Sequence, residues 1–376
     1  MLPDPDANPT RGHPPGSPLA GSRRVLVVRL DNLGDVLLTG PTFRALRAAV
    51  PDAELVLLGS PGGSAAASLL PWVDRVETLR AVWQDAQSRL PLDPARELAV
   101  IDDLRAIGAD AAVILTSFSQ TSWAPAYACY LAGIPVRAGH APDFGGSLLS
   151  HPVAGPAPAH QAERNLHVLT ALGVPVTDDS LEIRVPASAT DAASRLLARG
   201  GLDGRVPPIV VLPGASCAAR RYPADRFAAV ARGVRDRTGL PLVIAGAEKE
   251  RPLTATVAAA VPGALDLGGE TGVTELAAIV ERAALVLTND SFGMHLADAV
   301  RVPVVTVFAG TDLEAEWAPR SAPSITLRRP TSCAPCRLFD CPIGHPCVDI
   351  PPEEVATAAI GLLETAPARR ELSWAG

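Results

Sequence analysis

The chain has 376 residues, and at about 150 residues per domain this length suggests two domains. Hydrophobic residues make up 48% of the chain and charged residues 19%, a composition that excludes an intrinsically disordered protein. The formal net charge of −7 at pH 7 argues against a general nucleic-acid-binding protein. Lys249 is the only lysine among 33 basic residues, so arginine supplies nearly all of the positive charge.

We predict no targeting signal in the N-terminal segment. Residues 1–22 are rich in proline and glycine and lack the apolar stretch of a signal peptide, so we predict a disordered tail. No apolar run approaches the roughly 20 residues that span a bilayer. These features predict a cytoplasmic protein whose thiols stay mostly reduced.

Strand-like and helix-like segments alternate along the chain, and seven short apolar runs have the character of buried strands. They lie at residues 25–29, 55–58, 111–116, 209–212, 242–245, 285–288 and 304–308. Apolar strands separated by helices are typical of parallel sheets that are covered on both faces. The pattern therefore predicts an α/β fold in which ligands bind at the carboxyl ends of the strands.

The pattern restarts after a polar, turn-rich stretch, which we take as the domain boundary. A short strand predicted at 181–185 closes an N-terminal domain of residues 23–185. The C-terminal domain then covers residues 186–350. An amphipathic helix at 355–364 lies in the terminal segment 351–376, whose last dozen residues we expect to fray.

Gly34 and Asp35 directly follow the first predicted strand. A glycine allows a ligand to approach the backbone closely. Asp35 stands at the start of the next helix, where a carboxylate can cap free N–H groups or act as a general base at the mouth of a cleft. Asp31 is a rival base that lies closer to the strand.

Two loops of the second half have features of anion-binding sites. In the first, Gly214 and Ser216 form a loop of small residues before Arg220, so a hydroxyl, backbone N–H groups and a cation could surround a diphosphate. The second loop follows the predicted strand at 285–288 and opens a helix. It carries Asp290, Ser291, Gly293 and His295, of which the histidine could bond a phosphate oxygen.

Four of the six cysteines cluster in a loop at residues 333–347, with His345 among them. They are Cys333, Cys336, Cys341 and Cys347. Four thiolates at this spacing could hold a structural zinc ion, whereas an iron–sulfur cluster fits less well. The alternative is a cysteine-rich loop that binds no metal.

In their order and spacing, these segments resemble glycosyltransferase family 9, the ADP-heptose:lipopolysaccharide heptosyltransferases and their relatives. The resemblance covers residues 23–365. It is carried by the following segments: the strand VLVVR at 25–29, GDV at 34–36, Pro41, PGA at 213–215, RYP at 221–223, Gly246 with Glu250, NDS at 289–291 and MHL at 294–296. Many members also carry a Pro-Cys segment near the C-terminus, as at residues 335–336.

The resemblance implies a GT-B fold, in which two Rossmann-like domains face each other across a cleft and a terminal helix packs back on the first domain. It implies an inverting, metal-independent transfer of heptose from ADP-heptose to an acceptor hydroxyl, with Asp35 as the base. The acceptor, which is a glycan, a lipid-linked or a small molecule, would bind loops of the N-terminal domain at 59–63, 116–120 and 140–146. We expect a monomer that requires no cofactor, with peripheral membrane association as an option and no nucleic-acid partner.

The resemblance also assigns donor-binding residues. Ser216 and Arg220 would face the diphosphate, Glu250 the nucleoside, and Asp290, Ser291, Gly293 and His295 the phosphate and the sugar. Two positions depart from the family pattern. Relatives commonly carry lysine at the position of Arg220, and they usually carry glycine at the position of Phe292.

Two alternatives remain open. One is a GT-B glycosyltransferase that uses a GDP-, UDP- or dTDP-sugar in natural-product or glycoconjugate synthesis. The other is a non-catalytic module that binds nucleotide sugars, against which the retained Asp35 and His295 argue. A nucleotide-sugar 2-epimerase shares the architecture, but its characteristic residues do not match this chain.

Overall fold

The computed structural model describes residues 16–86, 89–155 and 157–366. Residues 1–15 of the predicted tail and residues 367–376 of the predicted frayed end lie outside this range. Residues 16–22 form turns, and Leu19 is fully buried in the core of the first domain. The prediction of a disordered tail is therefore wrong for residues 16–22, because Leu19 gains apolar contacts there.

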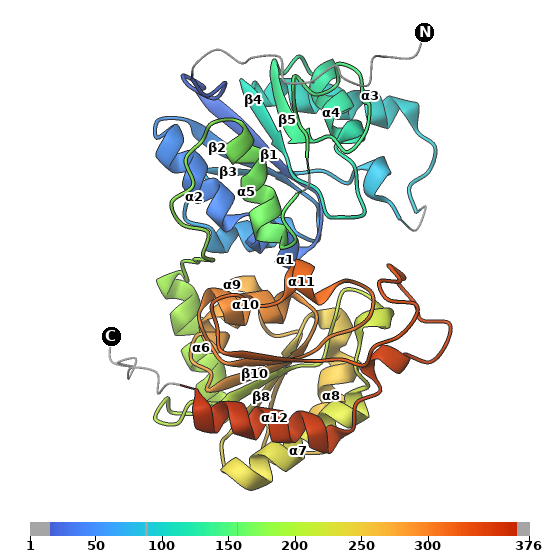
Figure 1. The fold of residues 1–376 in the computed structure, drawn as a ribbon. Helices are drawn as coiled ribbons and strands as arrows, with labels where there is room; N and C mark the ends of the chain where they lie inside the picture. The colour runs from blue at the N-terminus through green and yellow to red at the C-terminus, as the bar shows by residue number, and fades with distance from the viewer. Residues whose placement is uncertain (1–15, 87–88, 156, 367–376) are drawn as a thin grey trace.

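Two α/β domains are stacked on one another, each built on a six-stranded parallel sheet (Figure 1). The N-terminal sheet consists of β1 (Arg24–Arg29), β2 (Glu54–Gly59), β3 (Arg75–Thr78), β4 (Ala111–Ile114), β5 (Val136–His140) and β6 (His151–Val153). The C-terminal sheet consists of β7 (Ile209–Leu212), β8 (Leu242–Gly246), β9 (Leu265–Gly268), β10 (Leu285–Asn289), β11 (Val304–Val307) and β12 (Ser324–Leu327).

Both sheets have the same topology. The N-terminal order is β3-β2-β1-β4-β5-β6, and the C-terminal order is β12-β11-β10-β7-β8-β9. In each domain the first strand is therefore central and pairs with the second and fourth strands, as in a Rossmann fold. The strand order reverses between β1 and β4 and between β7 and β10, and ligands of such sheets bind at that point. The predicted α/β class with two parallel-sheet domains is confirmed.

Helices connect the strands in both domains. Those before the boundary are α1 (Leu33–Leu37), α2 (Gly40–Ala49), α3 (Pro94–Ile107), α4 (Trp123–Leu131) and α5 (Gln161–Ala171). Those after it are α6 (Ala187–Arg199), α7 (Ala224–Thr238), α8 (Arg251–Ala259), α9 (Val273–Val280), α10 (Phe292–Ala299), α11 (Glu314–Trp317) and α12 (Pro352–Thr365). Short 3-10 segments complete the set: η1 (Ser64–Leu69), η2 (Val82–Gln84), η3 (Ala218–Arg220), η4 (Glu248–Glu250) and η5 (Pro346–Val348).

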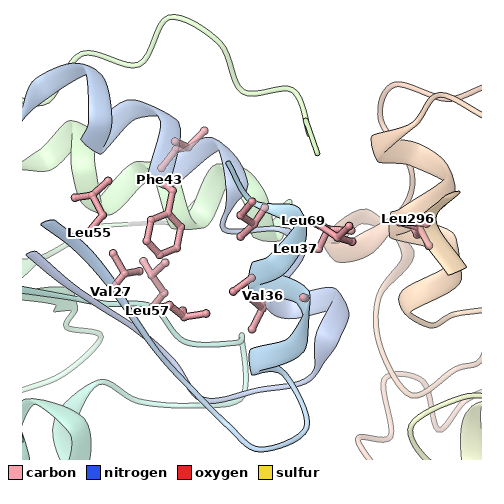
Figure 2. Close-up of a cluster of buried hydrophobic side chains, with 14 of the residues drawn as sticks. Val27, Val36, Leu37, Phe43, Leu55, Leu57, Leu69 and Leu296 are labelled. Carbon is pink, nitrogen blue, oxygen red and sulfur yellow. The ribbon is translucent and has the colours of Figure 1, made fainter. Parts of the chain in front are cut away.

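Apolar side chains from strands and helices form the core of the N-terminal domain (Figure 2). Val27 and Leu55 of adjacent strands pack with Phe43 of α2, and all three are fully buried. Burying one such side chain stabilises the fold by about 1.5–3 kcal/mol. The same cluster includes Leu296 of α10, so apolar contact continues from the first domain into the second.

The terminal helix α12 packs on the C-terminal domain, beside α7 (Figure 1). Its buried residues Val355 and Leu362 share a cluster with Phe227 of α7. The hydroxyl of Tyr222 donates to the carbonyl of Ile350 at 2.6 Å and fixes the approach to α12. The expectation that the last helix packs back on the N-terminal domain is therefore wrong, because its apolar face is covered by α7.

The segment between α5 and α6 has no strand at residues 181–185, so that prediction is also wrong. Arg184 instead donates its backbone N–H to the carbonyl of Leu69 at 2.9 Å, outside any sheet. Leu181 is buried among residues of both domains, including Trp317. Within the described residues, no helix combines the length and apolarity that crossing a bilayer requires.

Candidate active site

An open cavity of about 840 Å³ lies between the two domains. It is lined by the loops that follow β1 and β4 in the first domain and β7 and β10 in the second. These are the points where the strand order of each sheet reverses, so the two ligand-binding edges face the same space.

Every catalytic and nucleotide-sugar-binding residue predicted from the sequence lines this cavity. The set consists of Gly34, Asp35, Gly214, Ser216, Arg220, Glu250, Asp290, Ser291, Gly293 and His295. Of the predicted acceptor loops, 59–63 contributes Gly62 and 116–120 contributes Ser117, Ser119 and Gln120. Residues 140–146, all of which the structure describes, do not line the cavity.

Asp35 lies in the first turn of α1, and protein groups hold both of its carboxylate oxygens. The guanidinium of Arg29 contacts Oδ1 at 2.7 Å, and the backbone N–H of Asn32 donates to Oδ2 at 3.0 Å. The hydroxyl of Ser117 lies 3.4 Å from Oδ1. Asp35 therefore caps its helix and also faces the cavity. Sequence reasoning missed Arg29, whose only signal is a charge at the end of an apolar strand.

Asp31 shares the same arginine but is more deeply enclosed. Its carboxylate lies 3.0 Å from Nε of Arg29 and accepts from the side-chain amide of Gln120 at 2.6 Å. Burial raises the pKa of Asp31, and the positive charge of Arg29 partly opposes that effect. The fully buried Arg29 thus holds two carboxylates side by side at the cavity wall.

In the second domain, Asn289 connects the loops that follow β7 and β10. Its amide donates to the carbonyls of Pro213 at 2.9 Å and Gly214 at 3.1 Å, and its carbonyl accepts from the backbone N–H of Tyr222 at 2.9 Å. The end of β10 therefore sets the path of the loop after β7. Asn289 is not among the predicted site residues, although it belongs to the motif that carries the resemblance.

At two positions of the cavity wall, glycine leaves room for a neighbouring side chain to pack against the backbone. A Cβ atom on Gly214 would lie 2.2 Å from the carboxylate of Glu250, which accepts from the backbone of Ala247 at 2.9 Å. A Cβ atom on Gly293 would lie 2.3 Å from the side chain of Leu212. Glycine at 293 thus allows α10 to pack on β7, and Phe292 before it lines the cavity.

Arg220 is held by three polar groups on the cavity wall. Its guanidinium pairs with Asp312, donates to the hydroxyl of Thr311 at 3.1 Å and lies 3.9 Å from Asp290. Burial by itself lowers the pKa of Arg220, but the carboxylates of Asp290 and Asp312 raise it above its ordinary value. Burial also raises the pKa of Asp290 to about 6, although Arg220 opposes the shift.

Asp312, Trp317 and Arg337 also line this wall and are absent from the predicted set. Arg337 pairs with Asp312 and also contacts Glu316 at 2.9 Å. The indole N–H of Trp317 donates to Glu316 at 3.3 Å. Asp312 could have been found, because it follows a predicted strand as Asp290 does. Arg337 gave no signal of its own, since it lies inside the cysteine cluster.

His295 brings the two halves of the site together. It is 5% exposed, and its ring lies so near the first domain that a Cβ atom on Gly34 would come within 2.6 Å of its Cδ2. Its ring centroid lies 6.2 Å from that of Trp317. Burial lowers the pKa of His295 to about 4, against the influence of Asp35, so its imidazole is neutral at pH 7.

The cysteine-bearing segment folds against the loops that follow β7 and β11. Within the described residues, no three side chains of the metal-binding types are grouped closely enough to hold an ion, so the zinc prediction gains no support. Cys341 accepts the backbone N–H of His345 at 3.2 Å. Cys347 is buried, and a Cβ atom on Gly310 would touch its side chain at 3.2 Å.

Comparisons with known proteins agree with this architecture. The model of glycosyltransferase family 9 (heptosyltransferase) matches residues 98–345, more than half of the chain. Lipopolysaccharide heptosyltransferase 3 of Escherichia coli is 25% identical over 298 residues, which cover 77% of this chain and 84% of that protein. Lipooligosaccharide heptosyltransferase 2 of Haemophilus influenzae is 28% identical over 144 residues, 37% of this chain and 41% of that protein.

Solved structures share the fold at low sequence identity. A family 9 glycosyltransferase from Veillonella parvula has a TM-score of 0.72 and 22% identity, covering 91% of this chain and 97% of that chain. The ADP-heptose lipopolysaccharide heptosyltransferase II of Escherichia coli has a TM-score of 0.71 and 21% identity, covering 91% and 98%. The two domains therefore form a GT-B fold, and the chain is a glycosyltransferase that belongs to family 9.

Proposed function

We propose that this protein is a metal-independent, inverting glycosyltransferase that moves heptose from ADP-heptose to an acceptor hydroxyl, with Asp35 as the general base. One observation carries the proposal: Asp35 of the first domain and the anion-binding elements of the second line the same cavity. The names of the relatives, which include an ADP-heptose lipopolysaccharide heptosyltransferase, support this donor. The acceptor would occupy the N-terminal side of the cavity and the donor the C-terminal side.

The donor side offers several groups that favour a leaving diphosphate. Arg220 supplies a permanent positive charge, and the neutral imidazole of His295 can donate one hydrogen bond. The first N–H groups of α10 have no acceptor within the helix, and the helix dipole favours negative charge there. These fixed groups stabilise the charge that develops on the phosphate oxygen as the glycosidic bond breaks. They supply this charge stabilisation without a metal ion.

On the acceptor side, Asp35 takes the proton of the attacking hydroxyl. The acceptor oxygen forms a bond with the anomeric carbon from the face opposite the diphosphate, which leaves with the electrons of the broken C–O bond. This displacement inverts the configuration of the sugar. Because Arg29 and the backbone of Asn32 hold the carboxylate, Asp35 is already oriented before the substrates bind.

Replacing Asp35 tests the proposal. Asp35→Asn keeps the size of the side chain but removes the basic oxygen, so we expect kcat to fall by about 10²-fold or more. The affinity for ADP should survive, because Asp35 does not hold the diphosphate. Turnover is measured as ADP release from ADP-heptose with a panel of glycan, lipid-linked and small-molecule acceptors, and affinity by calorimetry.

Asp31→Asn is the matched control, since Asp31 contacts the same arginine. It should leave most of the turnover in place. Normal turnover of Asp35→Asn would contradict the role of Asp35, and a loss confined to Asp31→Asn would assign the base to Asp31. Binding of the donor without hydrolysis or transfer by the wild type would favour a non-catalytic module instead.

Phe292 favours a second candidate for the donor. Its side chain belongs to the cavity wall at a position where the family resemblance implies glycine. A ring there changes the space beside the sugar, so the donor can differ from ADP-heptose; the alternative is a GDP-, UDP- or dTDP-sugar used in natural-product or glycoconjugate synthesis. Calorimetric titration with these sugars and with ADP-heptose separates the candidates. Tighter binding of another nucleotide sugar would replace ADP-heptose in the proposal.

Several further expectations stay predictions. They are a cytoplasmic location, a monomeric state, peripheral membrane association, a structural zinc ion at the cysteines, and no nucleic-acid partner. The net charge of −7 supports the last of these.

A further inference from the structure

We infer that Arg337 is a second cation of the donor site and binds the diphosphate of the nucleotide sugar together with Arg220. This inference rests on the proposed function, because it requires a nucleoside diphosphate in the cavity. Arg337 lines the cavity, and its side chain is 30% exposed. Its guanidinium has five N–H donors, so its contacts with Asp312 and Glu316 leave donors for a ligand.

The backbone ties Arg337 to both loops that surround Arg220. The N–H of Arg337 donates to the carbonyl of Thr311 at 3.1 Å. Two residues later, the carbonyl of Phe339 accepts the N–H of Ala219 at 2.9 Å. The segment thus links the loop after β11 to the residue that precedes Arg220, and this linkage fixes the position of Arg337 before any ligand arrives.

A single carboxylate holds the two arginines next to each other. Asp312 offers Oδ2 to Arg220 and Oδ1 to Arg337, and its side chain is only 5% exposed. Arg337 also contacts both oxygens of Glu316, at 3.0 and 2.9 Å. Two guanidinium groups on adjacent parts of one wall match the several oxygens of a diphosphate, which arginine binds through paired N–H donors.

The carboxylates beside Arg220 offset its positive charge, so Arg220 alone would bind a diphosphate weakly. The two nearly buried carboxylates of Asp290 and Asp312 lie beside the single cation Arg220 if Arg337 is left out. Such an excess of negative charge would repel a diphosphate, and the interaction is strong because the groups are shielded from water. Arg337 reduces this excess and also neutralises the carboxylate that Arg220 contacts.

The test compares ligands with and without the diphosphate on the full chain. Calorimetry gives the affinity for ADP and for adenosine, or for UDP and uridine if the wild type prefers UDP. In Arg337→Ala we expect the diphosphate to bind about 10- to 100-fold more weakly, the usual loss for one charged hydrogen-bonding partner. The affinity for the nucleoside should not change, since it carries no phosphate.

Three further variants keep the result interpretable. Arg337→Lys retains the charge without the planar fork and should recover part of the affinity for ADP. Arg337→Ala combined with Glu316→Gln removes one charge of each sign and should also recover part of it, which keeps the test valid if the single variant folds poorly. Arg328→Ala is the matched control, because Arg328 pairs with the half-exposed Glu314 at 3.4 Å and does not line the cavity, so both affinities should stay unchanged.

The outcomes separate this inference from the function on which it rests. If Arg337→Ala folds and binds ADP as the wild type does, Arg337 does not bind the diphosphate. An equal loss for ADP and adenosine would also overturn the inference, because it would indicate a collapsed pocket. A wild-type protein that binds no nucleoside diphosphate would contradict the proposed function itself.

Discussion

Two arginines, the buried Arg29 and the partly exposed Arg220, each hold a pair of carboxylates at the cavity wall. Arg29 lies between Asp31 and Asp35, and Arg220 lies between Asp290 and Asp312. Removing one partner of a buried ion pair costs about 3–5 kcal/mol, because the other charge stays buried without compensation. The side chains that would bind substrates are therefore fixed in the free protein.

The neutral state of His295 leads to a prediction about protons. Burial lowers its pKa to about 4, whereas a bound diphosphate favours the charged imidazolium and so raises that pKa. We therefore expect ADP binding to take up protons and to tighten as the pH falls from about 7 to about 5. Calorimetry in buffers of different ionisation enthalpy measures this uptake directly.

Asp290 acts in the same direction, so two variants are needed to assign the protons. Its pKa is raised to about 6 by burial, and protonation there removes a negative charge from the wall. His295→Gln should abolish part of the uptake and Asp290→Asn another part. Proton uptake that is unchanged in His295→Gln would show that the imidazole does not become charged in the complex.

At the scale of elements, burial on both faces decided which strands could be predicted. The central strands β1, β7 and β10 read as apolar runs because helices cover both of their sides. The edge strand β3 alternates between half-buried and exposed residues, and β12 has no fully buried residue. Neither strand has an apolar run, so each is recognised as a strand only by its hydrogen bonds to the neighbouring strand in the structure.

The residues of the site could be predicted only where they follow a strand that the sequence itself reveals. Asp35, Asp290 and His295 could be predicted because each follows a strand whose end is visible in the sequence. Arg337 reaches the site through a contact with Asp312, 25 residues away, which no local pattern encodes. The cysteine-bearing segment thus contributes Arg337 to the site because of how it folds, which its composition does not reveal.

The placement of α12 predicts a stability effect within the C-terminal domain. Leu362 is 7% exposed and packs in the cluster that contains Phe227 of α7. Leu362→Ala should lower the free energy of unfolding by about 2–4 kcal/mol, since it removes buried apolar contacts and leaves a cavity. Urea denaturation measures the loss, and Thr357→Ala on the exposed face of α12 is the control. A change as small as that of the control would show that α12 does not stabilise the domain.

At the scale of the whole molecule, the domains meet along one side of the cavity. Phe118 packs edge-on against Trp317 with ring centroids 6.3 Å apart. The ring of His160 donates to the carbonyl of Ala318 at 3.1 Å, and Arg320 reaches Asp179 at 2.8 Å. These contacts join the first domain to the region around α11, whose residue Trp317 also borders the cavity. The spacing of the two halves of the site therefore depends on how the domains are packed.

A substitution at Gly34 can change the packing between the two domains without removing a polar group. A methyl group there would lie 2.6 Å from Cδ2 of His295, which is buried and has little room to turn. In Gly34→Ala either the domains move apart or the imidazole leaves the space beside Asp35. We expect kcat to fall by about tenfold or more, because small displacements of reacting groups reduce rates strongly.

Two measurements and a control locate the cause of that loss. Small-angle scattering of the ADP complex should show a larger radius of gyration if the domains part, and an unchanged radius with weaker ADP binding if the imidazole turns instead. Gly361→Ala places a methyl group in α12 with no atom within 4 Å and should leave turnover and scattering unchanged. The Gly34→Ala protein should remain folded, because alanine favours a helix more than glycine does. Wild-type turnover in that variant would mean that close contact between Gly34 and His295 is not required for transfer.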